Sequence, residues 1–286
     1  MPATAAHTPQ ASAAALHHAV QGDGPALVLL HPAGLDHTAM RPLAEAMAAS
    51  HRVVSVDLRG HGLSPDCAPG TRLADLAGDV ASVIALAAGG RAAVLGVSLG
   101  GMVAQALALA HPQAVSALLL CGCTGTFADE LRPMLRERGT AALRGGMAAV
   151  LDATLQRWFT PAALAHGASG AVAAVRARLL ADRPANWAAT WDAIAGHDAL
   201  PTLGEVAVPT LVLAGERDAA TPVPATQALA GAIPGARWTM LEGAPHMMQL
   251  ECPGAFHATV AAFLREAAPA APARPAGQAA APGAAP

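Results

Sequence analysis

The chain has 286 residues, of which 53% are hydrophobic and 13% charged, and its formal net charge is -3 at pH 7. This size and apolar content suffice for one large α/β domain or two small ones, and they exclude a globally disordered chain. The charge leaves no basic surface for nucleic acid and no polybasic patch for a membrane, and no apolar run approaches the ~18 residues of a membrane span.

The composition also limits the possible catalytic chemistry and the cellular compartment of the protein. All 17 positive charges are arginine, which excludes Schiff-base catalysis by lysine. The first twenty residues lack the charged start and apolar segment of a signal peptide, and four scattered cysteines are too few for a disulfide scaffold. Cys121 and Cys123 have no second pair facing them as metal ligands, so we interpret them as a strand end. We therefore expect a reduced, cytoplasmic protein without a metal ion; none of these features specifies an oligomeric state.

Short apolar runs alternate with helical stretches in the first 123 residues. Such alternation predicts an α/β fold with a mostly parallel central sheet and helices on both faces. Ligands of such sheets collect at the carboxyl ends of the strands. Buried strands are predicted at residues 26–31, 52–56, 92–97 and 115–120, and helices from Asp36 to about residue 50, at 73–88 and directly after Ser98.

The character of the sequence changes at residue 124. Residues 124–200 are helical in composition and contain eight arginines against seven acidic residues, which predicts a helical cap with a mild basic bias. Strands at 209–215 and 237–241 and helices at 221–230 and 253–266 then resume the first pattern. We expect a flexible N-terminus at 1–14, a core of 15–123 and 201–266, a cap at 124–200 and a disordered Ala/Pro tail at 267–286.

Ser98 lies where the predicted strand 92–97 meets a run of helix formers, so the chain must turn sharply at that residue. Gly96 and Gly100 flank it in a Gly-x-Ser-x-Gly pattern, where a β-carbon would collide with the turn or with the packed helix. The pattern alone is weak, but a strand before it and a helix after it are the context that it requires. Ser98 is therefore our candidate nucleophile.

A serine hydroxyl needs a base and a group that orients the base. An acidic loop follows the strand at 209–215, and His246 follows the strand at 237–241. The order Ser98, Asp218, His246 is the order of a Ser, Asp, His triad in this kind of fold. Glu216 is the competing acid; we prefer Asp218 because it lies further beyond the strand end.

Acyl transfer also needs two N–H groups aimed at the developing oxyanion. The backbone of Leu99 supplies one at the helix start. The second is expected from the loop after the first predicted strand, where Pro32 has no N–H and Ala33 follows it. We interpret His31 in the same loop as structural. No Gly-x-Gly-x-x-Gly opens a helix, so we expect no cofactor.

The loop that follows the strand at 52–56 is dense in glycine and polar residues. We expect Asp57 and Arg59 to bond the backbone and each other, holding the strand ends in place, and His61 could face the pocket.

Five motifs together resemble the α/β-hydrolase superfamily over roughly residues 15 to 266. They are His31-Pro32-Ala33-Gly34, residues 57–64, 96–101, 215–218 and 243–246. Within that superfamily, three stretches look like 3-oxoadipate enol-lactonases: Gly-Val-Ser-Leu-Gly-Gly-Met-Val-Ala-Gln at 96–105, Arg-Trp-Phe-Thr-Pro at 157–161 and Glu-Cys-Pro at 251–253. The resemblance implies a small-molecule substrate, a lactone that bears a carboxylate and is opened through an acyl-enzyme.

A cap arginine could hold such a carboxylate as a bidentate partner, and Arg132, Arg136 and Arg144 are candidates, with a solvated helix face as the alternative for each. Trp158 could wall the pocket or belong to the cap core. Two other functions stay open: a carboxylesterase or perhydrolase acting on small acyl esters, and a non-catalytic binding protein of the same fold.

Overall fold

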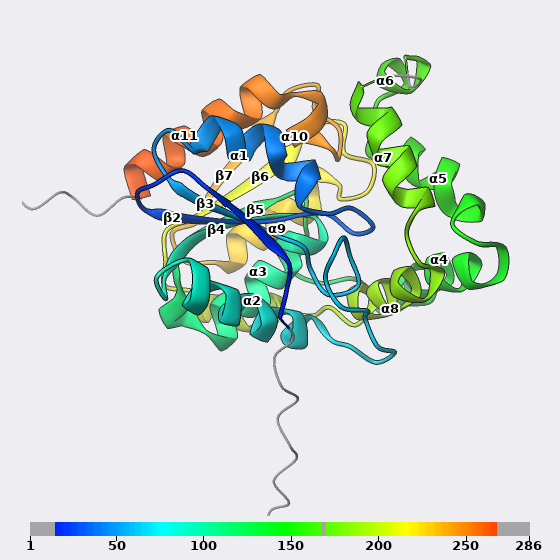
Figure 1. The fold of residues 1–286 in the computed structure, drawn as a ribbon, viewed down its shortest axis with the longest axis horizontal. Helices are drawn as coiled ribbons and strands as arrows, with labels where there is room; N and C mark the ends of the chain where they lie inside the picture. Colours follow the sequence, from blue (N-terminus) through cyan, green and yellow to red (C-terminus); the bar gives the residue numbers. More distant parts are fainter. Residues whose placement is uncertain (1–14, 167–169, 268–286) are drawn as a thin grey trace, which may run out of the picture.

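The computed structural model describes residues 15–166 and 170–267. Its centre is a seven-stranded sheet of order β1-β3-β2-β4-β5-β6-β7, in which β1 is antiparallel to β3 and every other pair is parallel (Figure 1). The α/β-hydrolase fold class predicted from the sequence is confirmed. The strands are β1 His18–Gln21, β2 Ala26–Leu30, β3 Arg52–Val56, β4 Ala92–Val97, β5 Val115–Cys121, β6 Thr210–Gly215 and β7 Arg237–Leu241.

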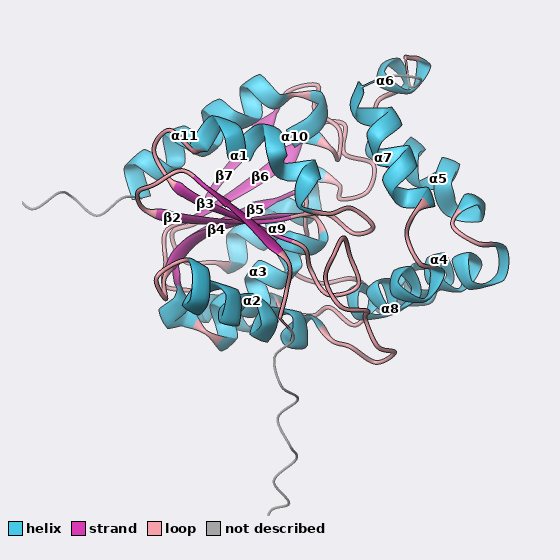
Figure 2. Ribbon diagram, in the orientation of Figure 1, coloured by secondary structure: helices cyan, strands magenta, loops and turns pink. Residues whose placement is uncertain are grey.

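Helices cover both faces of the sheet (Figure 2). Alternate residues of a strand point to opposite faces, and β2 shows this directly: Leu27 and Leu29 belong to one buried cluster, Val28 and Leu30 to the other. The first cluster packs under α1 and α11, the second against α2, α3 and α9. The helices of the core are α1 Arg41–Met47, α2 Leu73–Ala87, α3 Leu99–Ala110, α9 Val223–Ala232, α10 Met248–Glu251 and α11 Pro253–Ala267.

A group of helices between β5 and β6 stands to one side of the sheet (Figure 1). An isolated antiparallel bridge between Thr126 and Asp198 holds the two ends of this cap together. Within the cap, α4 and α8 touch backbone to backbone at Gly139, where a β-carbon would lie 2.8 Å from the α-carbon of Ala188. The cap helices are α4 Arg132–Gly145, α5 Ala148–Trp158, α6 Pro161–Ala165, α7 Gly170–Leu180 and α8 Pro184–Ala195.

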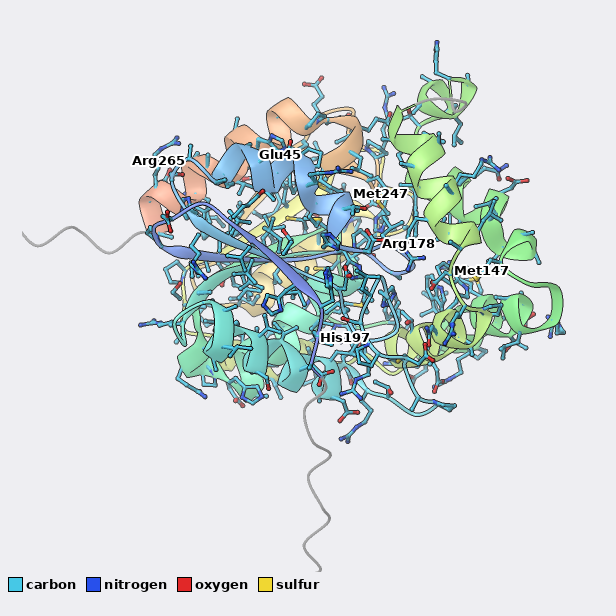
Figure 3. All side chains as sticks on the ribbon, in the orientation of Figure 1. Glu45, Met147, Arg178, His197, Met247 and Arg265 are labelled. Atoms are coloured by element: carbon cyan, nitrogen blue, oxygen red, sulfur yellow. The ribbon has the colours of Figure 1, made fainter. Side chains whose placement is uncertain are left out.

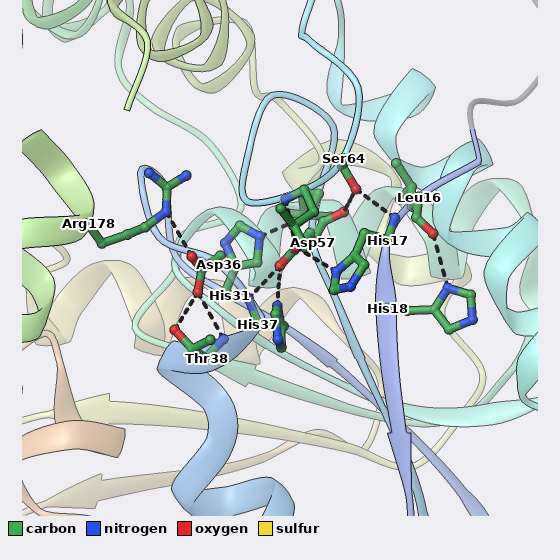
Figure 4. A network of polar contacts seen from close by, with 12 residues as sticks. Leu16, His17, His18, His31, Asp36, His37, Thr38, Asp57, Ser64 and Arg178 are labelled. Atoms are coloured by element: carbon green, nitrogen blue, oxygen red, sulfur yellow. Dashed lines mark hydrogen bonds and ion pairs between the residues drawn. The ribbon is translucent and has the colours of Figure 1, made fainter. Parts of the chain in front are cut away.

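The cap is fastened to the core at the carboxyl edge of the sheet. Arg178 of α7 reaches toward the core and pairs with Asp36 at 2.8 Å (Figures 3 and 4). The backbone N–H of Met247 donates to the carbonyl of Trp158 at 3.0 Å. These contacts fix the position of α5 and α7 over the strand ends where the candidate site lies.

Two elements differ from the sequence prediction. β1 was not predicted, and the helix expected from Asp36 to about residue 50 is a 3-10 turn, His37–Met40, followed by the shorter α1. Asp36 does cap that turn, because its side chain accepts from the Thr38 N–H at 3.0 Å. The termini predicted as flexible or disordered, 1–14 and 267–286, lie outside the described residues, except for Ala267, which ends α11. Among the described helices, none is both long and apolar enough to cross a bilayer.

Candidate active site

Ser98 forms a strained turn between β4 and α3. Its φ of 55° and ψ of -114° make it the one non-glycine residue with positive φ in the described chain. A β-carbon on Gly96 would lie 2.1 Å from the Gly100 carbonyl oxygen, and one on Gly100 would lie 2.3 Å from the Leu30 carbonyl oxygen. Such strain costs about 1–3 kcal/mol and persists only where packing imposes it. The two glycines therefore allow the turn that presents Ser98 at the sheet edge.

His246 and Asp218 form a buried pair beyond β7 and β6. His246 Nδ1 lies 2.8 Å from Asp218 Oδ2, and the two residues are 1% and 7% exposed. Asp218 Oδ1 accepts from the backbone N–H groups of Ala220 and Thr221 at 2.8 and 2.7 Å. Because these donors fix the carboxylate as an acceptor, the proton of a neutral His246 resides on Nδ1 and leaves Nε2 as the basic nitrogen. The alternative acid, Glu216, is exposed and accepts from the Gly243 N–H instead.

Gly122 lies directly beside this pair. It has a φ of +54°, and a β-carbon there would lie 3.2 Å from Asp218 Oδ2 and 3.4 Å from His246 Nδ1. Its carbonyl accepts the Thr221 hydroxyl at 3.0 Å. No role was predicted for Gly122, although it lies between two cysteines at a predicted strand end. Cys121 and Cys123 are free and buried, and burial raises the pKa of Cys121 well above its usual value and that of Cys123 to about 12.

The two candidate oxyanion donors lie at neighbouring strand ends. Leu99 is the first residue of α3, and Ala33 lies in a turn closed by the Leu35 N–H and the Pro32 carbonyl at 3.3 Å. Both residues are buried, and in the described chain neither backbone N–H has a hydrogen-bond acceptor. The N-terminus of α3 adds its partial positive charge at this point. Two N–H groups are thus free to bind an anionic oxygen.

His31 and His61 support the loops around Ala33. His31 Nε2 accepts from the Leu58 N–H at 3.0 Å, so its Nδ1 carries the proton and donates to the Pro32 carbonyl at 2.8 Å. The His61 ring lies 4.9 Å from that of His31, and its Nδ1 lies 3.0 Å from the Arg59 carbonyl. Burial lowers the pKa of His31 and lowers that of His61 to about 3. Both imidazoles are neutral structural groups.

Asp57 and Arg59 do not bond to each other, contrary to the sequence prediction. Arg59 forms a bidentate pair with Asp79 of α2, at 2.8 and 2.7 Å. Asp57 instead accepts from the imidazoles of His17 and His37, each at 2.8 Å (Figure 4). Arg59 therefore joins the loop to α2, whereas Asp57 joins it to His17 and His37.

His17, His37 and Asp57 form the one group of three or more described His, Cys, Asp and Glu side chains whose ligand atoms lie within 4.8 Å of one another. Each oxygen of Asp57 already accepts two hydrogen bonds, because the backbone N–H groups of His37 and Leu63 also donate, at 2.7 and 3.0 Å. Burial by itself raises the pKa of Asp57, but these hydrogen bonds outweigh it and hold the pKa below its usual value. Four hydrogen bonds saturate a carboxylate, so they account for the cluster as a structural junction between β1, β3 and the His37 turn.

The three cap arginines predicted as substrate ligands are occupied within the cap. Arg136 pairs with Asp192 at 3.0 Å, and Arg144 pairs with Glu137. Arg132 pairs with Asp129 at 2.8 Å and also donates to the carbonyls of Ala195 and His197. Arg136 and Arg144 thus lie on solvated helix faces, as in the alternative interpretation, whereas Arg132 is largely buried and joins α4 to the end of α8.

Trp158 lies beside the candidate base, and two other arginines of the cap are partly buried. The Trp158 ring is 4% exposed and its centroid is 6.2 Å from that of His246. Arg138 and Arg157 are half-buried, and burial lowers the pKa of both. In the described chain neither guanidinium has an acidic partner. Neither arginine was predicted as a substrate ligand; Arg138 lies about 200° around the helix from Arg136, on a different face.

The family profile described as "Alpha/beta hydrolase family" matches residues 27–259. The chain is 30% identical over 249 residues to a pimeloyl-[acyl-carrier protein] methyl ester esterase of Nitrosomonas europaea, which covers 85% of this chain and 97% of the relative. It is 34% identical over 250 residues, 86% of its length, to polyketide synthase ThaQ of Burkholderia thailandensis, but it spans only 12% of that protein.

Solved structures give the same family. The enol-lactonase from Burkholderia xenovorans LB400 superposes with a TM-score of 0.82 at 30% sequence identity, covering 87% of this chain and 96% of that one. Similarity thus extends over nearly the whole described chain and joins proteins named as esterases with proteins named as lactonases.

Proposed function

The chain belongs to the α/β hydrolase family, and from this premise we propose that it is a serine hydrolase that opens a small, carboxylate-bearing lactone through an acyl-enzyme. The observation that carries the proposal is the fixed His246–Asp218 pair, with a bond of 2.8 Å, at the same sheet edge as the strained Ser98. A nucleophile, a base and an orienting acid are the parts that acyl transfer requires.

In the proposed first step, Ser98 Oγ attacks the lactone carbonyl carbon while His246 Nε2 takes the hydroxyl proton. The N–H groups of Leu99 and Ala33 bind the oxyanion of the tetrahedral intermediate. When the intermediate collapses, the ring C–O bond breaks and His246 returns its proton to the leaving oxygen, which stays attached to the acyl group.

In the second step, His246 accepts a proton from a water molecule, and the resulting hydroxide attacks the acyl carbonyl. The bond to Ser98 Oγ breaks, the serine is reprotonated and the open carboxylic acid is released. Asp218 orients the imidazole and stabilises its cationic form in both steps. No group other than these side chains and water is needed for the atoms and charges to balance.

The substrate class rests on similarity to known proteins. The B. xenovorans protein is named an enol-lactonase, which favours 3-oxoadipate enol-lactone as the first substrate to test. The N. europaea relative, named a methyl ester esterase, supports the second candidate function: cleavage of a small acyl ester by the same steps, with the alcohol leaving the site.

The test is the rate of 3-oxoadipate enol-lactone hydrolysis beside that of 4-nitrophenyl acetate, for the wild type and Ser98→Ala. Fast, Ser98-dependent lactone opening with slow ester cleavage supports the lactonase. The reverse preference supports the esterase. Failure of Ser98 to react with a fluorophosphonate probe, with neither substrate cleaved, would overturn both and favour a binding protein.

A further inference from the structure

We propose that Glu251 is a positioning residue, whose carboxylate fastens the cap to the segment that carries His246 and so fixes Trp158 beside the base. The inference rests on the proposed hydrolase function, because it adds to that mechanism a residue that acts through the base and its buried neighbour. Glu251 and its partner Thr160 belong to the two stretches outside the serine turn that resemble enol-lactonases. No step of the proposed mechanism uses either residue.

Both oxygens of the Glu251 carboxylate accept hydrogen bonds from Thr160. Oε2 accepts from the Thr160 backbone N–H at 3.1 Å, and Oε1 accepts from its hydroxyl. The two residues are 91 positions apart in the chain, and Thr160 is 8% exposed. Hydrogen bonds to a carboxylate are stronger than those between neutral groups, particularly where water is largely excluded. This paired contact therefore fixes both the separation and the orientation of the two residues.

On the cap side, the contact holds the junction between α5 and α6. The Thr160 hydroxyl oxygen also accepts from the Ala163 N–H at 3.2 Å, which makes Thr160 the N-cap of α6. Trp158 is the last residue of α5, two positions earlier. Its buried ring lies 6.2 Å from that of His246, with 32° between the two ring planes. While Thr160 is held, Trp158 cannot move away from the base without breaking the hydrogen bonds to Glu251.

On the core side, the contact holds the segment that follows His246. Glu251 is the last residue of α10, and its N–H donates to the Met247 carbonyl at 3.0 Å. The Met247 N–H donates to the Trp158 carbonyl, also at 3.0 Å. Residues 158–160 and 247–251 are thus joined at both ends of the contact. Because His246 directly precedes this segment, a shift of the segment would displace the imidazole from Ser98.

The first test measures kcat per Ser98 site titrated with a fluorophosphonate, well below the unfolding temperature. The substrate is whichever of the lactone and the ester the wild type cleaves faster. Glu251→Ala should lower kcat per site about 10- to 100-fold, because a base displaced by about 1 Å loses up to that much. Glu251→Gln, whose amide oxygen can still accept from the Thr160 N–H, should lose less. A merely structural residue would change the number of titrated sites or the unfolding temperature, but not kcat per site.

Matched variants show whether the contact itself is responsible. Glu242→Gln removes an exposed carboxylate from the same loop, on the other side of His246, and should keep the wild-type kcat. Thr160→Ser retains both donors and should stay near the wild type. Thr160→Val removes the hydroxyl alone and should lower kcat per site about 2- to 10-fold.

The double variant Glu251→Ala/Thr160→Val should be no slower than Glu251→Ala alone, because both substitutions remove the same contact. Losses that multiply in the double variant would overturn the proposal, since they would show that the two residues act independently.

Hydrogen exchange separates this inference from the proposed function, because it needs no substrate. Glu251→Ala should increase deuterium uptake in peptides that cover residues 158–160 and 246–251, and Glu242→Gln should not. A wild type that cleaves neither substrate would overturn the hydrolase itself. An unchanged kcat per site in Glu251→Ala would instead overturn the positioning role and leave the hydrolase intact, whatever the exchange rates.

Discussion

The buried carboxylates at the carboxyl edge of the core and the buried donors of the cap differ in their hydrogen bonding. In the core, both oxygens of Asp218 and all four acceptor positions of Asp57 are used by fixed partners. In the cap, Arg138, Arg157 and the Trp191 N–H have no hydrogen-bonding or ion-pair partner in the described chain. These two core carboxylates are saturated before any ligand binds, whereas the cap groups, like the N–H groups of Ala33 and Leu99 at the core edge, have no acceptor in the described chain.

The saturated carboxylates suit the proposed mechanism. Groups that move protons or orient a base work best when they are preorganised, because no reorganisation is then needed during the reaction. Substitutions that disturb these core groups should therefore lower activity.

The largest effect is expected at Ser98. Ser98→Ala should lower kcat at least ~10⁴-fold, because no other group replaces the nucleophile. Ser98→Gly should be equally inactive but more stable than Ser98→Ala by about 1 kcal/mol, since glycine relieves the positive φ. Urea unfolding of both variants beside the kinetics checks this. Equal stabilities would mean that the turn is not strained.

Asp218→Asn tests whether saturation of the carboxylate orients the base. The amide can keep the N–H bonds from Ala220 and Thr221 only by turning its NH₂ toward His246, which then places the imidazole proton on the wrong nitrogen. We expect kcat to fall by about 10⁴-fold with little loss of stability. Glu216→Gln is the control and should stay near wild-type activity. A comparable loss in that variant would make Glu216 the orienting acid.

Gly122→Ala should disturb the same pair without removing any polar group. The new methyl would lie 3.2 Å from Asp218 Oδ2 and 3.4 Å from His246 Nδ1, at a backbone φ that disfavours alanine. A displacement of the base by a fraction of an ångström to about 1 Å costs up to about 100-fold in kcat. Steady-state kinetics measure the loss. Gly235→Ala, which has a similar φ but open space around it, controls for backbone strain and should retain full activity.

The sequence patterns predicted where most strands lie along the chain, because a buried strand is a local pattern. The motifs predicted the family, because the serine turn is a local pattern too. The resemblance to α/β hydrolases and to enol-lactonases is confirmed. β1 escaped detection because it is four half-exposed residues that form a strand only by pairing with β3, from Val53 to Val56. Such pairing is a long-range contact that no short sequence window contains.

Charge pairing in the cap escaped prediction for a related reason. Arg136 and Arg138 are two residues apart and chemically identical, yet one meets Asp192 of α8 and the other stacks on Trp191 of the same helix. Which arginine is left without an acid depends on how α4 and α8 pack at Gly139. Tertiary packing also decides the partner of Arg59, which pairs with Asp79 and not with Asp57, although Asp57 is nearer in sequence.

The smallest effect concerns the neutral histidines that complete the saturated core. Burial lowers the pKa of His61 from 6.5 to about 3, so the unfolded chain binds its proton more readily than the folded one. Stability from this residue is fully present above pH 6.5 and is lost as the pH falls toward 3. Between pH 7 and 5 it should contribute about 2 kcal/mol to the fall in unfolding free energy. His61→Gln should remove that contribution in urea titrations at the two pH values, whereas the same change at the exposed His166 should not. An unchanged pH dependence in His61→Gln would show that His61 is not held neutral, and the contrast between a saturated core and an open cap would then fail at this loop.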